Sequence, residues 1–135
     1  MKRLFLLFTT IFTVTLFGQT VQSKNLSDFL PKGYVILKKV SGDLNKDGIE
    51  DIVLIIKGTD KSKIIKHEYR GELDRNRRGI IVLFNKKDNY KLASKNYDCF
   101  SSENEDGGVY FAPGLSVKIK KGNLGIHYSH GRYGY

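Results

Sequence analysis

The sequence lacks most of the features on which small domains and enzymes rely. Its 135 residues include one cysteine, two prolines and no tryptophan. The single cysteine, Cys99, excludes an internal disulfide, and because no base lies beside it we expect a buried, unreactive thiol. The chain also lacks a serine elbow, a glycine loop that could cradle phosphate, and a pair of carboxylates with helical or strand support. These absences leave no candidate catalytic residue and favour a protein that is not an enzyme.

The first 18 residues have the composition of a secretory signal peptide. Lys2 and Arg3 precede an apolar run over residues 4–17, and the small residue Gly18 follows it. The run is too short to span a membrane comfortably, and the lack of a cysteine there excludes a diacylglyceryl anchor. We expect residues 1–18 to be removed and the mature protein to be periplasmic or extracellular, with no transmembrane span. An N-terminal anchor left in place is the alternative.

The chain is basic, with a formal net charge of +9. Removal of Lys2 and Arg3 with the signal leaves 21 basic and 14 acidic side chains, a net charge of +7. Such a surface suits an anionic envelope polymer or a protein partner. The charges are scattered, so they predict no specific nucleic-acid site, and a well-solvated surface is the simpler interpretation. A small exported domain without a disulfide needs another staple, and a bound metal would serve.

Short runs of β-branched and aromatic residues predict six strands. They lie at residues 34–40, 52–56, 79–84, 90–95, 115–119 and 124–128. The runs at 52–56 and 79–84 are apolar without interruption, which is typical of central strands covered on both faces. The fold class is therefore mainly β: an antiparallel sheet or small β-sandwich of about six strands, with little helix.

The rest of the chain divides into a loose segment and one domain. Residues 19–33 are expected to be loose, apart from one helical turn at 25–30 that Pro31 ends. Residues 34–135 form a single β domain. The aromatic tail at 130–135 has the composition of a further strand, so we expect the natural chain to continue past Tyr135.

Two polar segments interrupt the strands and are predicted to be long loops. The first, 58–78, carries several arginines between Arg70 and Arg78 with acidic residues among them. These arginines could hold phosphate or carboxylate groups of a glycan or partner, or pair with the interleaved acids. The second, 98–113, carries the acidic cluster Glu103–Asp106. That cluster could be a second cation site or a solvated turn.

The segment 42–51 has the pattern of a calcium loop. Side chains that can offer oxygen to a hard cation recur at Asp43, Asn45, Asp47 and Asp51. A glycine permits the sharp bend that such a loop needs. An EF-hand would require a glutamate at the twelfth position of the loop, where Leu54 stands, and the flanks have strand rather than helical composition. A strand–loop–strand site is therefore predicted.

Residues 42–55 resemble the FG-GAP (VCBS-like) repeat of integrin-type β-propellers, whose hallmark is Gly-Asp-Leu-Asn-x-Asp-Gly-x-x-Asp before an apolar strand. The resemblance implies a calcium ion held by Asp43, Asn45, Asp47, the main-chain carbonyl of Ile49, and Asp51. Propellers repeat this unit several times, whereas this chain has one copy. We therefore expect a small exported bacterial protein with a single motif rather than a closed propeller.

The alternative for this loop is a turn rich in Asp and Asn that binds no metal. Three carboxylates so close in sequence repel one another unless a cation neutralises them, which favours metal binding. No histidine lies nearby, so the ion would be structural. The sequence thus predicts an exported, calcium-stabilised β domain that acts as a binding or structural module at the cell envelope. The alternative function is an envelope-polymer hydrolase or hydrolase inhibitor that uses residues 66–78 and 98–108.

Overall fold

The protein is mainly β, which confirms the predicted fold class. A computed structural model describes residues 20–104 and 114–129, and these contain nine strands and two short 3-10 helices but no α-helix. The strands are β1 (Gln22–Ser23), β2 (Tyr34–Gly42), β3 (Asp51–Gly58), β4 (Ile64–His67), β5 (Gly71–Asp74), β6 (Arg78–Asn85), β7 (Tyr90–Phe100), β8 (Gly114–Lys120) and β9 (Asn123–Ser129). The helices are η1 (Leu26–Phe29) and η2 (Lys61–Lys63).

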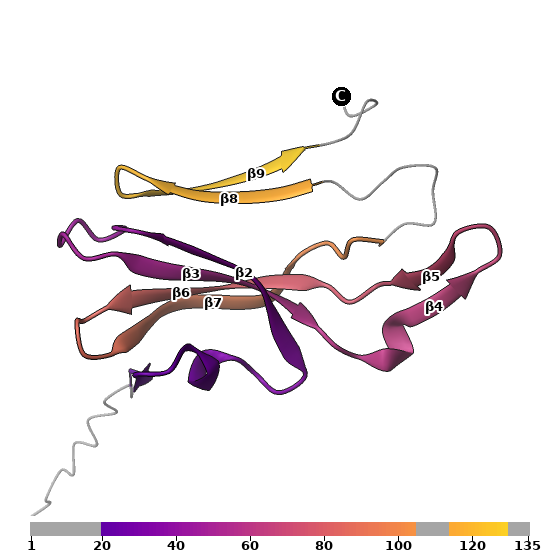
Figure 1. The fold of residues 1–135 in the computed structure, drawn as a ribbon, viewed down its shortest axis with the longest axis horizontal. Coiled ribbons are helices and arrows are strands. Elements are labelled where there is room, and N and C mark those ends of the chain that lie inside the picture. The colour runs from indigo at the N-terminus through magenta and orange to yellow at the C-terminus, as the bar shows by residue number, and fades with distance from the viewer. Residues whose placement is uncertain (1–19, 105–113, 130–135) are drawn as a thin grey trace, which may run out of the picture.

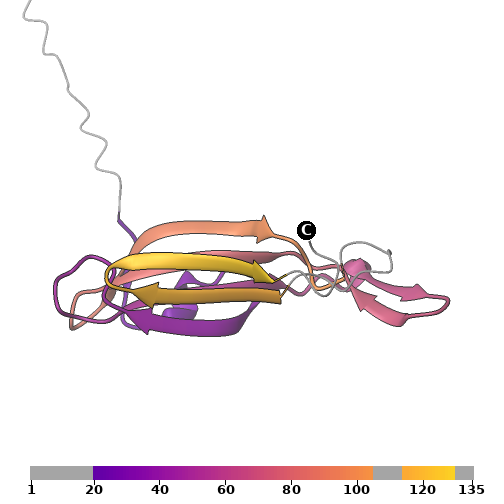
Figure 2. The same ribbon diagram turned by 90° about the horizontal axis from the view of Figure 1, so that it is seen from above.

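Five of the strands form one antiparallel sheet in the order β1-β7-β6-β3-β2. β2 with β3, and β6 with β7, are hairpins between neighbours in the chain. β3 and β6 pair although β4 and β5 lie between them in sequence, and the β4–β5 hairpin projects beyond one end of the sheet (Figure 1). The remaining hairpin, β8–β9, stacks over one face of the sheet (Figures 1 and 2).

The core lies on both faces of β3 and β6. The first six residues of each of these strands are buried. Successive side chains of a strand point to opposite faces, so Leu54 packs on the face covered by Phe29 of η1, while Val53 packs on the face covered by Val117 of β8. The two uninterrupted apolar runs are therefore central strands, as predicted, because a different part of the chain covers each face.

All six predicted strands are present, but the N-terminal segment differs from the prediction. Residues 19–33 were expected to be loose; from Gln22 onward they belong to the fold. β1 pairs with the start of β7. The expected helical turn is η1, and its Phe29 is only 6% exposed. Phe29, with Leu26 and Leu30 packed against the same cluster, therefore joins β1 in attaching a mostly polar segment to the sheet.

The polar segment 58–78 was predicted to be a loop, and this was wrong for residues 64–67 and 71–74, which form β4 and β5. Polar contacts at the base of this hairpin, rather than a set of buried apolar side chains, hold it to the sheet. The Nζ atom of Lys57 lies 2.8 Å from Oδ2 of Asp74, and the buried Asn76 accepts the N–H of Asp60 at 2.9 Å. Burial disfavours the charged form of Asp74, but the hydrogen bonds from Lys57 and Asn76 outweigh it, so its pKa is lowered.

Several sequence predictions fall outside the described residues. They concern the signal peptide at 1–18, the tail at 130–135 and the acidic residues at 105–106. Within residues 20–104 and 114–129, neither helix is long or apolar enough to cross a membrane.

The contact between the sheet and the β8–β9 hairpin depends on a glycine. A Cβ atom at Gly42 would lie 2.6 Å from Cγ2 and 2.7 Å from Cβ of Ile119. Replacing Gly42 with Ala must push β8 away from β2, and we expect Gly42→Ala to lower the free energy of unfolding by about 1–3 kcal/mol, measured by urea denaturation. Gly125→Ala is the matched control, because the nearest atom to its Cβ is the Lys118 carbonyl oxygen at 3.7 Å. Equal losses in both variants would contradict this packing.

Candidate metal centre

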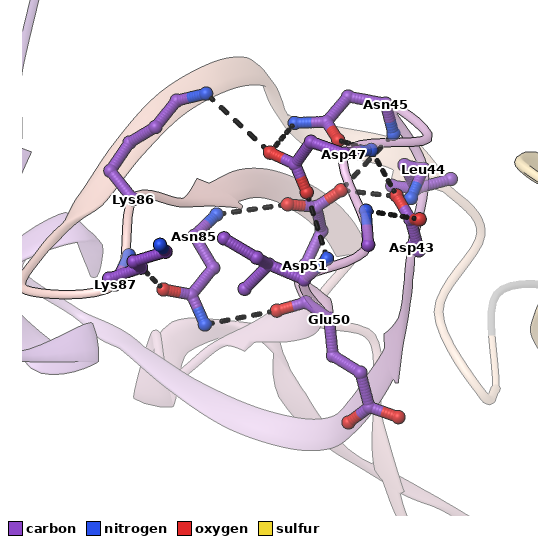
Figure 3. A network of polar contacts seen from close by, with 11 residues as sticks. Asp43, Leu44, Asn45, Asp47, Glu50, Asp51, Asn85, Lys86 and Lys87 are labelled. Carbon is purple, nitrogen blue, oxygen red and sulfur yellow. Dashed lines mark hydrogen bonds and ion pairs between the residues drawn. The ribbon is translucent and has the colours of Figure 1, made fainter.

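The loop 43–50 connects two strands, as the sequence predicts, because β2 ends at Gly42 and β3 begins at Asp51. Two residues of the loop adopt positive φ angles, Lys46 at 62° and Gly48 at 83°. Glycine adopts this conformation without strain, whereas lysine adopts it at some cost. The two positions turn the chain back on itself, so that the side chains of Asp43, Asn45 and Asp47 face the inside of the loop (Figure 3).

Asp51 is the anchor of this loop. Its side chain is fully buried and accepts three main-chain hydrogen bonds. Oδ2 accepts the N–H groups of Leu44 at 2.8 Å and Asn45 at 3.3 Å, while Oδ1 accepts the N–H of Asn85 at 2.9 Å. One carboxylate therefore joins the β2–β3 loop to the end of β6, where the turn into β7 begins (Figure 3).

The other three polar side chains close the loop through short-range hydrogen bonds. Oδ2 of Asp43 accepts the N–H of Gly48 at 2.9 Å, and Oδ1 of Asp47 accepts the N–H of Ile49 at 2.9 Å. Oδ1 of Asn45 accepts the N–H of Asp47 at 3.0 Å. Such local bonds are typical of turns rich in Asp and Asn. These hydrogen bonds thus give the loop a defined shape.

The charge of the loop is only partly balanced. The N–H of Ile49 lowers the pKa of Asp47, with burial opposing this and Asn45 and Lys86 adding to it. Nζ of Lys86, from the β6–β7 turn, lies 3.8 Å from Oδ2 of Asp47. Among the described residues, no other cationic side chain comes within ion-pair distance of the three loop carboxylates. The three carboxylates are therefore offset by one ion pair, with Lys87 adding a longer-range attraction to Asp47.

The donor set fits a hard cation in its chemistry. Carboxylates, an amide oxygen and a main-chain carbonyl are the ligands that calcium prefers. A carboxylate has about four lone-pair sites, so Asp51 keeps one after its three hydrogen bonds. The present arrangement is not a chelate, because no three His, Cys, Asp or Glu side chains in the described ranges are placed to hold one ion. Nδ2 of Asn45 also donates to Oδ2 of Asp47 at 2.9 Å, so an ion requires these two side chains to turn.

Two residues of this centre were missed by the sequence argument. Asn85 donates its N–H to Asp51 and its Nδ2 to the carbonyl of Glu50 at 3.1 Å, and Lys86 supplies the nearby ammonium. Both lie between the predicted strands 79–84 and 90–95, directly after the first of them. Pairing of β3 with β6 would have brought that turn beside the loop, but nothing in the sequence specifies which strands pair.

A shallow cleft of about 360 Å³ lies beside the loop, on the side of the β8–β9 turn. It is lined by Gly42, Asp43, Lys46, Ile119, Lys121 and Gly122. Two ammonium groups and one carboxylate thus surround a small open space. This mixture suits a small polar group rather than an extended apolar ligand.

The arginine segment and the acidic segment lie against each other. Nε of Arg78 donates to the carbonyl of Ser101 at 2.8 Å, and Nε of Arg77 donates to the carbonyl of Asp98 at 3.0 Å. Nδ2 of Asn104 reaches the carbonyl of Asp74 at 3.5 Å. Main-chain carbonyls, rather than the interleaved acids, accept these hydrogen bonds. The two segments hence meet, but the described contacts hold strands together and form no open site.

Cys99 was expected to be a buried thiol, and this was wrong. It lies exposed near the end of β7, with Sγ 3.7 Å from the carbonyl oxygen of Asn96. Residues 98–113 were predicted to be a loop, whereas β7 continues to Phe100 and pairs there with Arg78 of β6. Cys99 therefore lies in a strand.

Comparisons with protein-family models, with curated proteins and with solved structures find no match to this chain. The likeness of residues 42–55 to a known repeat therefore rests on the loop itself, and the loop has to be judged by its own geometry.

The role of Asp51 as an anchor can be tested in the absence of any metal. In Asp51→Asn the amide has only one accepting oxygen, so at least one buried N–H loses its partner. We expect a loss of about 1.5–3 kcal/mol in the free energy of unfolding, measured by urea denaturation in chelator. Glu50→Gln is the control, because its side chain is exposed and points away from the loop (Figure 3). Similar stabilities for both variants would refute the anchoring role.

Proposed function

We propose that this chain is an exported, calcium-stabilised β domain that serves as a binding or structural module at the cell envelope. Asp43, Asn45, Asp47, the carbonyl of Ile49, and Asp51 would hold the ion. The observation that carries the proposal is the charge of the loop: three carboxylates gather in one turn, with Lys86 as the nearest cation at 3.8 Å. A calcium ion would replace this partial neutralisation and supply the staple that a domain without disulfides otherwise lacks.

The position of the loop supports a structural role for the ion. Asp51 is the first residue of β3, the strand at the centre of the core, and it also holds the end of β6. An ion bound here would brace two central strands. No histidine adjoins the loop among the described residues, where the neighbouring ionisable side chains include Lys46, Glu50 and Lys86, so we assign the ion no part in catalysis.

The second candidate function is a hydrolase or hydrolase inhibitor that acts on envelope polymers. It is favoured by one observation, the contact of the segments 66–78 and 98–104 through Arg77, Arg78 and Asn104. Its weakness is chemical, because these contacts join arginines and an amide to main-chain carbonyls and bring no pair of carboxylates together.

The calcium ion can be tested by thermal melts with calcium and with chelator. For three carboxylate ligands we expect a dissociation constant of about 0.1–1 mM, so 10 mM calcium would stabilise the folded chain by about 1.4–2.7 kcal/mol. This corresponds to a rise of several degrees in the melting midpoint. Asp47→Ala should melt at the same temperature with and without calcium.

The matched control is Asp88→Ala, which removes an exposed carboxylate from the β6–β7 turn. It should keep the calcium response of the wild-type chain, so that loss of the response in Asp47→Ala reports the site and not the net charge. Identical wild-type melts in calcium and chelator would exclude the metal. The loop would then be a turn closed by hydrogen bonds.

The two candidate functions are separated by an activity assay on dye-labelled cell-wall polymer. A binding or structural module should release no more dye than a heat-inactivated sample, and it should not slow release by an added wall hydrolase. Release of dye, or a slowed hydrolase, would overturn the module in favour of the second candidate.

A further inference from the structure

β2 is an edge strand whose outer side has no partner among the described residues. It runs for nine residues and pairs with β3 on one side only. β1 covers part of the opposite edge of the sheet, where Gln22 and Ser23 pair with the start of β7. The edge formed by β2 therefore carries a row of main-chain N–H and C=O groups that another strand could pair with.

The first half of β2 is apolar and exposed. Val35, Ile36 and Leu37 are each 41% exposed. Val35 lies opposite Lys57 and Ile36 opposite Ile56, so these two side chains point to different faces of the sheet. The register shifts between Ile36 and Lys38, which leaves Leu37 in a bulge. Apolar side chains are thus available on both faces of the free edge.

The apolar residues are followed directly by two lysines. Lys38 lies opposite Ile55 and Lys39 opposite Leu54, which again places one side chain on each face. Both are exposed, and no hydrogen bond or ion pair joins either ammonium to another described residue. Lysines on an edge strand discourage pairing with a like-charged strand but leave an acidic strand free to pair.

We propose that the free edge of β2 binds an extended segment of another protein by strand addition. The segment would carry two or three apolar residues next to two consecutive acidic residues. The apolar residues would lie beside Val35 and Ile36, and the acidic ones beside Lys38 and Lys39, one on each face. Main-chain hydrogen bonds would supply affinity, and the apolar residues next to the acidic pair would supply specificity.

Charge selects this occupant over a second copy of the chain. A copy would bring two further lysines to the same edge, together with its own formal net charge of +9. An acidic segment would neutralise the lysines instead. The inference builds on the proposed role as a binding module but needs no metal. The melts in calcium and chelator test the ion separately, so calcium binding and strand addition can each be refuted without the other.

The experiment uses the protein purified as its host cell produces it and a labelled peptide of about ten residues that contains Glu-Glu followed by Val-Ile-Val. This order places the acids beside Lys38 and Lys39 when the peptide runs antiparallel to β2, as the other strands of the sheet do. Fluorescence anisotropy should detect binding, and the double variant K38E/K39E should bind about tenfold more weakly, because two ion pairs become repulsive. A peptide with Lys-Lys in place of Glu-Glu should show the opposite preference. The control variant K118E/K120E makes the same change of charge on exposed residues of β8 and should bind within about twofold of wild type.

Strand addition itself is tested on the wild-type chain with two N-methylated peptides. In an added strand, alternate N–H groups point toward the edge and away from it. Methylation of one alternate set should therefore abolish binding, while methylation of the other set should leave it nearly unchanged.

Four results would overturn the inference. Equal binding by both double variants would indicate general attraction to a basic surface. Equal binding of both methylated peptides, or no binding of the unmethylated one, would exclude strand addition of this segment. A wild-type dimer in sedimentation that K38E/K39E alters would assign the edge to a second copy.

Discussion

The buried carboxylate of Asp51 is the interaction on which this end of the molecule depends. A buried charge is costly unless hydrogen bonds compensate it, and here three main-chain N–H groups from two separate segments do so. These hydrogen bonds hold the β2–β3 loop against the end of β6. It also fixes the start of β3, since Asp51 is its first residue. The polar loop and the apolar core are therefore one structure.

The core places a second constraint on the fold. Because β3 and β6 are apolar on both faces, another part of the chain must pack against each face of the sheet. The chain provides these two covers from its two ends: η1 with Phe29 on one face, and the β8–β9 hairpin with Val117 on the other. Neither cover is wide. The hairpin spans two strands above a sheet of five, and Ile126 on β9 remains 44% exposed. Much of β2 and β7 is consequently open to solvent, which leaves the sheet with accessible edges.

The sequence predicted the strands that have a clear apolar pattern. It did not predict the elements that form because of tertiary contacts. The uninterrupted apolar runs predicted β3 and β6, and short runs rich in β-branched and aromatic residues predicted β8 and β9. The β4–β5 hairpin has a single buried strand residue, Leu73, and is held at its base by polar contacts such as that between Lys57 and Asp74, so no periodicity marks it. The loop 43–50 was placed correctly between strands, but its contact with Asn85 depends on pairing between β3 and β6, which local sequence does not encode.

The geometry of the loop limits what a metal could add. The hydrogen bonds of Asp43, Asn45 and Asp47 already close the turn, and those of Asp51 already attach it to the sheet. A calcium ion would therefore not be needed to create the turn. Its contribution would be to remove the repulsion among three carboxylates that Lys86 offsets only in part. Such an ion stabilises a preformed loop, so its effect scales with its concentration relative to its dissociation constant. Folding and ion binding are then separable, and the same chain can be folded in both conditions.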